Sequence, residues 1–357
     1  MSIDFIPLPF YTPLYFLLIL VVVLSTFFEL QNSGFKKSKL GIVFLLFILF
    51  YMGLRPISGA FFGDMSSYAR QFNAYQYDFF YVFEKDIVWD TFMRWSAGIM
   101  SASFFFLVCA FLYIYPLYLV CKKWFAGYWF YAFLLLVASF SFWSYGTNGI
   151  RNGIAGSLFL LGMSRQKRVW QITWIVIAIG FHKTMLLPTL GLVLAQFYNK
   201  PKVLIRFWIL CIPMSLVAGG FWEGFFAGLG FEDERISYLT EGNVNDDDFS
   251  GTGFRWDFLA YSASAVFAGW YFIVKKGFND KIYFGLFNTY IFANAFWILV
   301  IRSNFSNRFA YLSWFMMALV IIYPFLKQQD QIPNQPKVLA KVLLFYFAFT
   351  FLMNVLL

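Results

Sequence analysis

Four arginines stand where apolar runs of the sequence begin or end, and their side chains could bind an anion. They are Arg55, Arg151, Arg302 and Arg308. The guanidinium group is planar, binds phosphate oxygens through two parallel hydrogen bonds and tolerates partial loss of its water. Ionisable residues beside long apolar runs are costly and usually functional. The alternative is that these side chains only reach a polar boundary or pair with neighbouring acids.

Two other side chains could transfer protons. Asp64 follows Gly63 in a polar segment, where its carboxylate could accept a proton from a hydroxyl group, and Tyr68 would share its helical face. Asp64 could instead cap the helix that follows. His182 is the only histidine, and its charge changes near neutral pH, so it could act as a base or bind phosphate. It could also be a hydrogen-bonded histidine at a membrane interface with neither role.

A glycine-rich stretch around Arg151 favours the start of a helix. Asn148 is expected to cap a helix that starts at Gly149, which puts Arg151 in the first turn, where the backbone amides also attract an anion. Gly149 and Gly153 allow close packing against a neighbouring helix. This packing role can coexist with anion binding.

The sequence predicts neither a metal site nor a cofactor. A single histidine cannot complete a zinc site, and the three cysteines lie in or beside apolar runs, where we expect them to be buried apolar residues. Asp246, Asp247 and Asp248 are better explained as part of a solvated polar loop than as a divalent-metal site. No glycine-rich phosphate loop followed by Lys-Ser/Thr occurs in the sequence, so nothing indicates ATP use.

The elements that must position these side chains are membrane helices. Of the 357 residues, 61% are hydrophobic and 13% are charged, whereas a soluble domain is about one-quarter charged. Apolar runs of roughly 17–25 residues recur along the chain, long enough to cross a bilayer. We predict an all-α, polytopic transmembrane helical bundle that forms a single integral membrane domain, residues 1–357, with longer outer loops at about 57–97 and 223–255. The predicted spans, about twelve in number, are residues 11–30, 40–56, 98–120, 125–144, 150–164, 170–183, 185–198, 204–222, 256–274, 282–301, 309–326 and 338–356.

The distribution of charge predicts the orientation of the bundle. Alternate loops hold 17 of the 27 basic residues and only three of the 18 acids, so the positive-inside rule places these loops in the cytoplasm and both termini outside. The cytoplasmic set consists of 14 Lys and three Arg, whereas the outer set consists of eight Arg and two Lys. The net charge of +9 is therefore mostly topological, and no nucleic-acid partner is expected. The preference for arginine outside favours an anion site there, and a lipid diphosphate is the natural anion at that depth.

An ordered set of short motifs runs from about residue 50 to 325. It consists of Arg55, Gly63, Asp64 and Tyr68; Gly-Ile-Arg-Asn-Gly-Ile-Ala at 149–155; Phe-His-Lys-Thr at 181–184; Arg235 and Tyr238; Phe-Arg-Trp-Asp at 254–257; and Asn-Arg-Phe-Ala-Tyr at 307–311. In this order the motifs resemble the EpsG branch of Wzy-type bacterial polysaccharide polymerases.

This resemblance implies a membrane glycosyltransferase with a GT-C-like bundle that joins oligosaccharide repeat units carried on undecaprenyl diphosphate, at the outer face of the bacterial cytoplasmic membrane. It implies a reaction in which the lipid diphosphate leaves. The missing metal-ligand clusters predict that this reaction is metal-independent. Expected partners are the lipid-linked oligosaccharide, membrane lipids and a chain-length regulator protein. The implied roles are catalysis for Asp64, His182 and Arg151; diphosphate binding for Arg55, Arg151, Arg302 and Arg308; and glycan binding for Tyr68, Arg235, Tyr238, Arg255, Asp257 and Tyr311.

Other membrane proteins that handle similar substrates are alternatives. A flippase for the lipid-linked unit would also bind phosphate, but its charged residues would lie in a central cavity near mid-membrane. An O-antigen ligase would differ mainly in its acceptor. A membrane acyltransferase usually needs a histidine within the membrane, a role that His182 leaves open.

Overall fold

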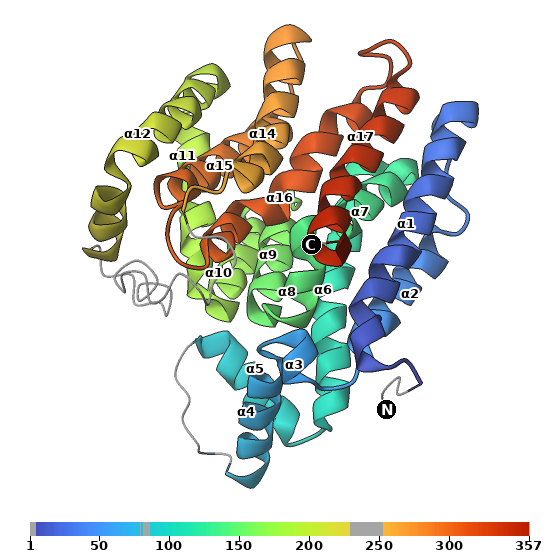
Figure 1. The fold of residues 1–357 in the computed structure, drawn as a ribbon, viewed down its shortest axis with the longest axis vertical. Coiled ribbons are helices and arrows are strands. Elements are labelled where there is room, and N and C mark those ends of the chain that lie inside the picture. The colour runs from blue at the N-terminus through green and yellow to red at the C-terminus, as the bar shows by residue number, and fades with distance from the viewer. Residues whose placement is uncertain (1–4, 79, 81–85, 229–252, 357) are drawn as a thin grey trace. The chain divides into compact units, whose positions relative to one another are not determined.

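The structure of the chain is a computed structural model that describes residues 5–78, 80, 86–228 and 253–356. Every regular element in these ranges is a helix (Figure 1). The α-helices are α1 (Leu8–Ser33), α2 (Gly41–Gly53), α3 (Gly59–Phe62), α4 (Met65–Tyr77), α5 (Ile87–Ala97), α6 (Ala102–Phe125), α7 (Trp129–Val137), α8 (Phe140–Thr147), α9 (Ile150–Met163), α10 (Arg168–Phe181), α11 (Leu186–Phe197), α12 (Pro201–Gly228), α14 (Trp256–Trp270), α15 (Lys281–Leu299), α16 (Ser306–Lys327) and α17 (Gln335–Phe351).

The lengths and apolar composition of these helices confirm an all-α polytopic membrane protein. In the described part of the chain, seven helical segments are long and apolar enough to cross a membrane, and α2, α9, α10 and residues 183–197 are shorter apolar helices. The long segments include residues 102–137, in which α6 and α7 follow each other almost without a break. The expected number of about twelve spans stays a prediction.

One predicted span differs from the structure. The span predicted at 125–144 is two helices, because α7 ends at Val137 and α8 begins only after Ser139, whose backbone is extended. The Ser139 hydroxyl donates a hydrogen bond of 2.7 Å to the Leu136 carbonyl oxygen, which satisfies one of the carbonyls left free at the end of α7. The predicted outer loop at 57–97 contains α3, α4 and α5.

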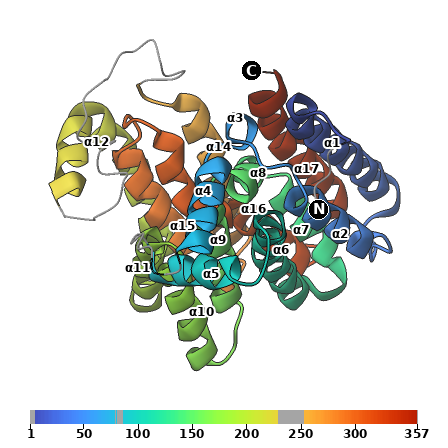
Figure 2. The same cartoon turned by 90° about the horizontal axis from the view of Figure 1, so that it is seen from below.

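The helices form two compact units: residues 1–183 together with 325–357, and residues 184–324. In the first unit α1 packs on α17, α6 packs between α2 and α9, and α9 packs on α10. The helices α3, α4 and α5 lie at one end of this unit, at the bottom in Figure 1 and facing the viewer in Figure 2. In the second unit α11 and α12 both pack on α15.

Tyrosine and tryptophan side chains join α1, α2 and α8 in the first unit. The Tyr11 hydroxyl donates to the Tyr51 carbonyl oxygen and the Tyr51 hydroxyl donates to the Tyr11 carbonyl oxygen, each at 2.7 Å. Tyr15 stacks on Trp143 of α8 with ring centroids 4.2 Å apart. Because each buried hydroxyl has a partner, these side chains join α1, α2 and α8 without a cost for unpaired polar atoms.

A polar cluster in the interior of the second unit joins four helices. The fully buried Asn294 amide of α15 donates to Ser262 Oγ of α14 at 3.2 Å and to Ser313 Oγ of α16 at 2.9 Å. Its Oδ1 accepts a 2.7 Å hydrogen bond from the Trp208 indole of α12. Ser262 Oγ also accepts from the Trp314 indole at 2.6 Å. Interhelical hydrogen bonds of this kind fix the register of apolar helices that would otherwise slide.

Candidate functional site

The Gly63–Asp64 turn is fixed to the junction between α8 and α9. Gly63 has a φ of +56°, and a Cβ atom added to it would lie only 2.4 Å from Asn148 Oδ1. Glycine is therefore required there both for its backbone conformation and for the close approach. The Asp64 backbone N–H donates a 2.8 Å hydrogen bond to the same Asn148 oxygen. The Asp64 carboxylate is exposed, and no described residue forms an ion pair with it.

Neither Asn148 nor Asp64 caps a helix with its side chain, and the hydrogen bond between Asp64 N–H and Asn148 Oδ1 engages Asn148 instead. Helix α9 begins at Ile150 with Gly149 in the capping position and without a side-chain cap, so the prediction that Asn148 caps it is wrong. Asn148 ends α8, and its side chain is taken by Asp64, which is 84 residues away in the sequence. Asp64 stands at the capping position of α4, but its carboxylate accepts no capping hydrogen bond.

Arg151 lies in the first turn of α9, as expected, and two side chains hold its guanidinium. Its Nη1 is 2.8 Å from Asp86 Oδ2 in an ion pair whose side chains are 14% and 3% exposed. Its Nε donates a 3.3 Å hydrogen bond to the Tyr68 hydroxyl. No described residue accepts a hydrogen bond from its Nη2. The guanidinium is thus fixed in place with one nitrogen free to bind a ligand.

Asp86 joins three separate segments, although no motif or spacing in the sequence singles it out. Besides the Arg151 pair, its Oδ1 accepts a 3.0 Å hydrogen bond from the backbone N–H of Lys183. Lys183 follows His182, which ends α10 and is buried. The buried Asp86 carboxylate therefore ties α9 and the His182–Lys183 junction to the start of α5.

Tyr68 lies beneath this network on α4. Its side chain is buried, its ring packs edge-on against Trp89 of α5 with centroids 5.2 Å apart, and the Arg151 guanidinium lies 5.8 Å from its ring centre. Burial raises the pKa of the Tyr68 phenol; the positive charge of Arg151 lowers it, and the charges of Asp64 and Asp86 raise it further. The phenol therefore remains protonated near neutral pH and lies within electrostatic range of all three groups.

Arg55 supports the same junction from inside the first unit. It is 2% exposed, and its guanidinium donates to the Met52 carbonyl oxygen and, at 3.3 Å, to the carbonyl oxygen of Thr147, the last residue of α8. Its Cζ lies 5.7 Å from the Phe62 ring centre. Its Nε is buried without a hydrogen-bond partner in the described structure.

The other two predicted diphosphate ligands, Arg302 and Arg308, belong to the second unit. Arg302 is exposed, and its Nη2 is 3.4 Å from the Leu216 carbonyl oxygen, two residues before the non-helical Ala218 that kinks α12. The guanidinium of Arg308 lies 4.8 Å from the Phe305 ring centre at the start of α16. The first unit brings Arg55 and Arg151 to one junction, and the second unit holds Arg302 and Arg308.

Three of the predicted glycan-binding residues of the second unit fall within the described residues. Arg255 and Asp257 form a two-point ion pair at the start of α14, with Nε–Oδ1 at 2.9 Å and Nη2–Oδ2 at 2.6 Å. Tyr311 is buried against Trp314. Arg235 and Tyr238 lie outside the described residues.

All three cysteines are buried and unpaired, as expected. Among the described residues, no three His, Cys, Asp or Glu side chains gather as they would around a metal ion. Asp246, Asp247 and Asp248 lie outside that part of the chain.

Comparison with known proteins agrees with the motifs. The model of the EpsG family matches residues 40–356, a range that includes every residue to which a role was assigned above. Comparisons with curated proteins and with solved structures give no match. Since the family match extends over nearly the whole chain, this protein belongs to the EpsG family, which includes Wzy-type polysaccharide polymerases.

Proposed function

We propose that this protein polymerises oligosaccharide repeat units carried on undecaprenyl diphosphate, at the outer face of the bacterial cytoplasmic membrane. Family membership supports a polysaccharide polymerase. Three motifs that are far apart in the sequence meet in the first unit, and this meeting assigns the proposed chemistry to particular residues. Asp64, Arg151 and the His182–Lys183 junction are linked there through Asn148 and Asp86.

Arg151 is the residue we assign to the leaving diphosphate. Transfer breaks the bond between the anomeric carbon and the diphosphate oxygen, and the electron pair leaves on that oxygen. A cation already in position stabilises this charge without moving during the reaction. Tyr68 accepts from Nε of Arg151 and Asp86 accepts from its Nη1, so Nη2 is the group that would donate to the phosphate.

Asp64 is the residue we assign to the acceptor sugar. Its exposed carboxylate would accept the proton of the acceptor hydroxyl as that oxygen bonds to the anomeric carbon. The hydrogen bond from its backbone to Asn148 keeps it beside the junction that begins α9. His182 is the alternative base, and its burial at the end of α10 makes it the less accessible of the two.

The remaining residues would act through these two. Asp86 and Tyr68 position Arg151, and Arg55 supports the last carbonyl of α8 from within the first unit. Diphosphate binding by Arg302 and Arg308 stays a prediction. So does glycan binding by Tyr68, Arg235, Tyr238, Arg255, Asp257 and Tyr311.

Purified protein in nanodiscs tests the proposal directly. Wild-type protein given a defined undecaprenyl-diphosphate oligosaccharide should form a ladder of longer products without any nucleotide. Asp64→Asn should slow the reaction by about 10²–10⁴-fold, as expected for loss of a general base. Arg151→Lys should slow it by about 10²–10³-fold, because an ammonium group cannot keep both anchoring bonds and still reach the phosphate.

Matched substitutions at exposed residues separate these effects from general damage. Arg70→Lys in α4 and Asp78→Asn directly after it change residues whose side chains form hydrogen bonds with Ser67 Oγ and with Phe80 N, respectively. The rate should stay within about twofold of wild type. Wild-type rate and product length in both Asp64→Asn and Arg151→Lys would overturn the assignment.

A further inference from the structure

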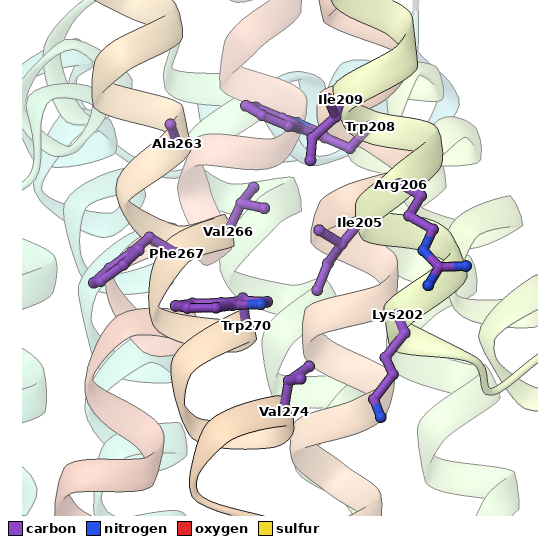
Figure 3. A pocket seen from close by; sticks show the side chains of 10 residues that line it. All are labelled: Lys202, Ile205, Arg206, Trp208, Ile209, Ala263, Val266, Phe267, Trp270 and Val274. Carbon is purple, nitrogen blue, oxygen red and sulfur yellow. The ribbon is translucent and has the colours of Figure 1, made fainter.

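A groove between α12 and α14 in the second unit has a volume of about 450 Å³ (Figure 3). Ligand sites commonly occupy about 300–1,000 Å³. One wall comes from α12, with Ile205 and Trp208, and the other from α14 and the turn that continues it, with Phe267, Trp270 and Val274. Both walls are apolar along most of their length. The groove thus has the size and lining of a site for a hydrocarbon chain.

Basic side chains gather at one end of this groove. Lys202 and Arg206 line it from α12, and the Lys275 ammonium lies 5.4 Å from the centre of the Trp270 ring on the opposite wall. In Figure 3 Lys202 lies at the same end as Val274, and the Arg206 side chain points toward that end. The groove thus has one cationic end and one apolar end.

The two cations of α12 have no internal counter-ion. Lys202 and Arg206 are exposed, and neither forms an ion pair or a side-chain hydrogen bond with the described residues. They are four residues apart on one helix, a spacing at which like charges repel. Arg206 also lies within the apolar length of α12, where an ionisable side chain is costly. An anion between the two groups would remove the repulsion.

The length of the apolar part matches one leaflet of a bilayer. Ala263 to Val274 spans eleven helical steps, or about 16 Å at a rise of 1.5 Å per residue. The hydrocarbon core of a bilayer is about 30 Å thick, so each leaflet supplies about 15 Å. Ile209 and Phe267 at the rim are 54% and 63% exposed, so the groove is open along its length. An acyl chain could therefore enter sideways from the membrane.

We propose that this groove binds an anionic membrane phospholipid. Lys202 and Arg206 hold the phosphate, Lys275 faces it from the other wall, and one acyl chain lies along Trp270 and Trp208. The Trp208 indole N–H is already bonded to Asn294, so this wall presents an apolar surface to the chain. Lys202, Arg206 and Lys275 belong to the lysine-rich side of the protein that is predicted to face the cytoplasm, where the membrane surface is negatively charged.

Lipid retention by the full-length protein tests this site. Protein equilibrated with vesicles of equal parts phosphatidylglycerol and phosphatidylcholine is extracted in mild detergent, and bound lipid is counted by native mass spectrometry. Wild type should retain phosphatidylglycerol in preference to phosphatidylcholine. Lys202→Gln with Arg206→Gln should weaken this retention by roughly 30-fold, since each cation near an anionic lipid contributes a factor of roughly five.

The control pair has the same spacing and the same change of charge elsewhere. Lys337→Gln with Lys341→Gln, four residues apart near the start of α17, should leave retention at the wild-type level. Equal losses from both pairs, or equal retention of the two lipids by wild type, would refute the site. Undecaprenyl phosphate that displaces phosphatidylglycerol at an equimolar amount would also refute it, because the groove would then belong to the carrier lipid.

Lys202→Gln with Arg206→Gln could fail to fold, so a second measurement uses wild-type protein. Salt screens charge interactions over about 3 Å at 1 M. Phosphatidylglycerol retention by wild type should therefore fall in 1 M sodium chloride, whereas phosphatidylcholine retention should not change. Retention of phosphatidylglycerol that is insensitive to salt would exclude the proposed phosphate contact.

Discussion

The ion pair between Asp86 and Arg151 should couple the two residues strongly, because it is buried. Breaking a buried pair by removing one partner costs about 3–5 kcal/mol, since the remaining buried charge loses the opposite charge that compensated it. Asp86 is 3% exposed and Arg151 is 14% exposed, so we expect the lower end, about 3 kcal/mol, for either Asp86→Asn or Arg151→Gln. Asparagine keeps the oxygen that accepts from the Lys183 N–H, so Asp86→Asn removes mainly the charge.

The two substitutions together should cost less than their sum. The double variant leaves no unpaired charge, so we expect a coupling energy of about 2 kcal/mol. Unfolding of the detergent-solubilised protein in increasing denaturant, followed by near-ultraviolet circular dichroism, gives the three free-energy changes.

A more exposed ion pair in the same protein provides the comparison. Arg255 and Asp257 are 21% and 39% exposed, so Arg255→Gln with Asp257→Asn should show a coupling below about 1 kcal/mol. A coupling of Asp86 to Arg151 no larger than that of the exposed pair would refute the argument from burial.

Three further outcomes follow from the structure. Gly63→Ala should lower both the free energy of unfolding and the rate of polymerisation, because the added Cβ would meet Asn148 and because the positive φ costs about 1–2 kcal/mol. Thermal unfolding and the product ladder measure the two effects. Gly98→Ala is the control and should change neither, because the nearest atom to its added Cβ is 3.6 Å away. Asn294→Leu should lower the free energy of unfolding by about 1–3 kcal/mol, because the buried Trp208 indole loses its acceptor; an unchanged unfolding midpoint would contradict this. Chelator should leave polymerisation unchanged, and a loss restored by magnesium or manganese would show that the reaction needs a metal.

The helices could be predicted where apolar runs end at charges or glycines, and less well where they do not. The predicted span 150–164 corresponds to α9 (Ile150–Met163), which begins after Gly149 and ends before the basic residues that follow. The division at Ala138 and Ser139 had no such signal, because neither proline nor glycine marks it. Trp143 of α8 stacks on Tyr15 of α1, and hydropathy cannot reveal a tertiary contact of this kind.

The candidate site was predictable only where the signal is local in the sequence. Arg151 was identifiable because an arginine beside an apolar run is unusual. Its partner Asp86 is 65 residues away and is one of several acids in a polar segment, so sequence alone gave no means of pairing them. The misassigned cap has the same origin: Asn148 suits a helix start locally, but its oxygen is taken by a backbone N–H 84 residues away.

The Asn294 cluster of the second unit has a consequence for biogenesis. As each helix leaves the translocon, polar groups that face lipid have no partner, so the Asn294 amide has none from α15 alone. Two acceptors and one donor come from α12, α14 and α16, and α16 is synthesised last. We therefore expect nascent chains that end before α16 to be retained by membrane chaperones or degraded, whereas chains that include Ser313 lock the four helices together. A single amide would thus set the point in synthesis at which this half of the protein becomes stable.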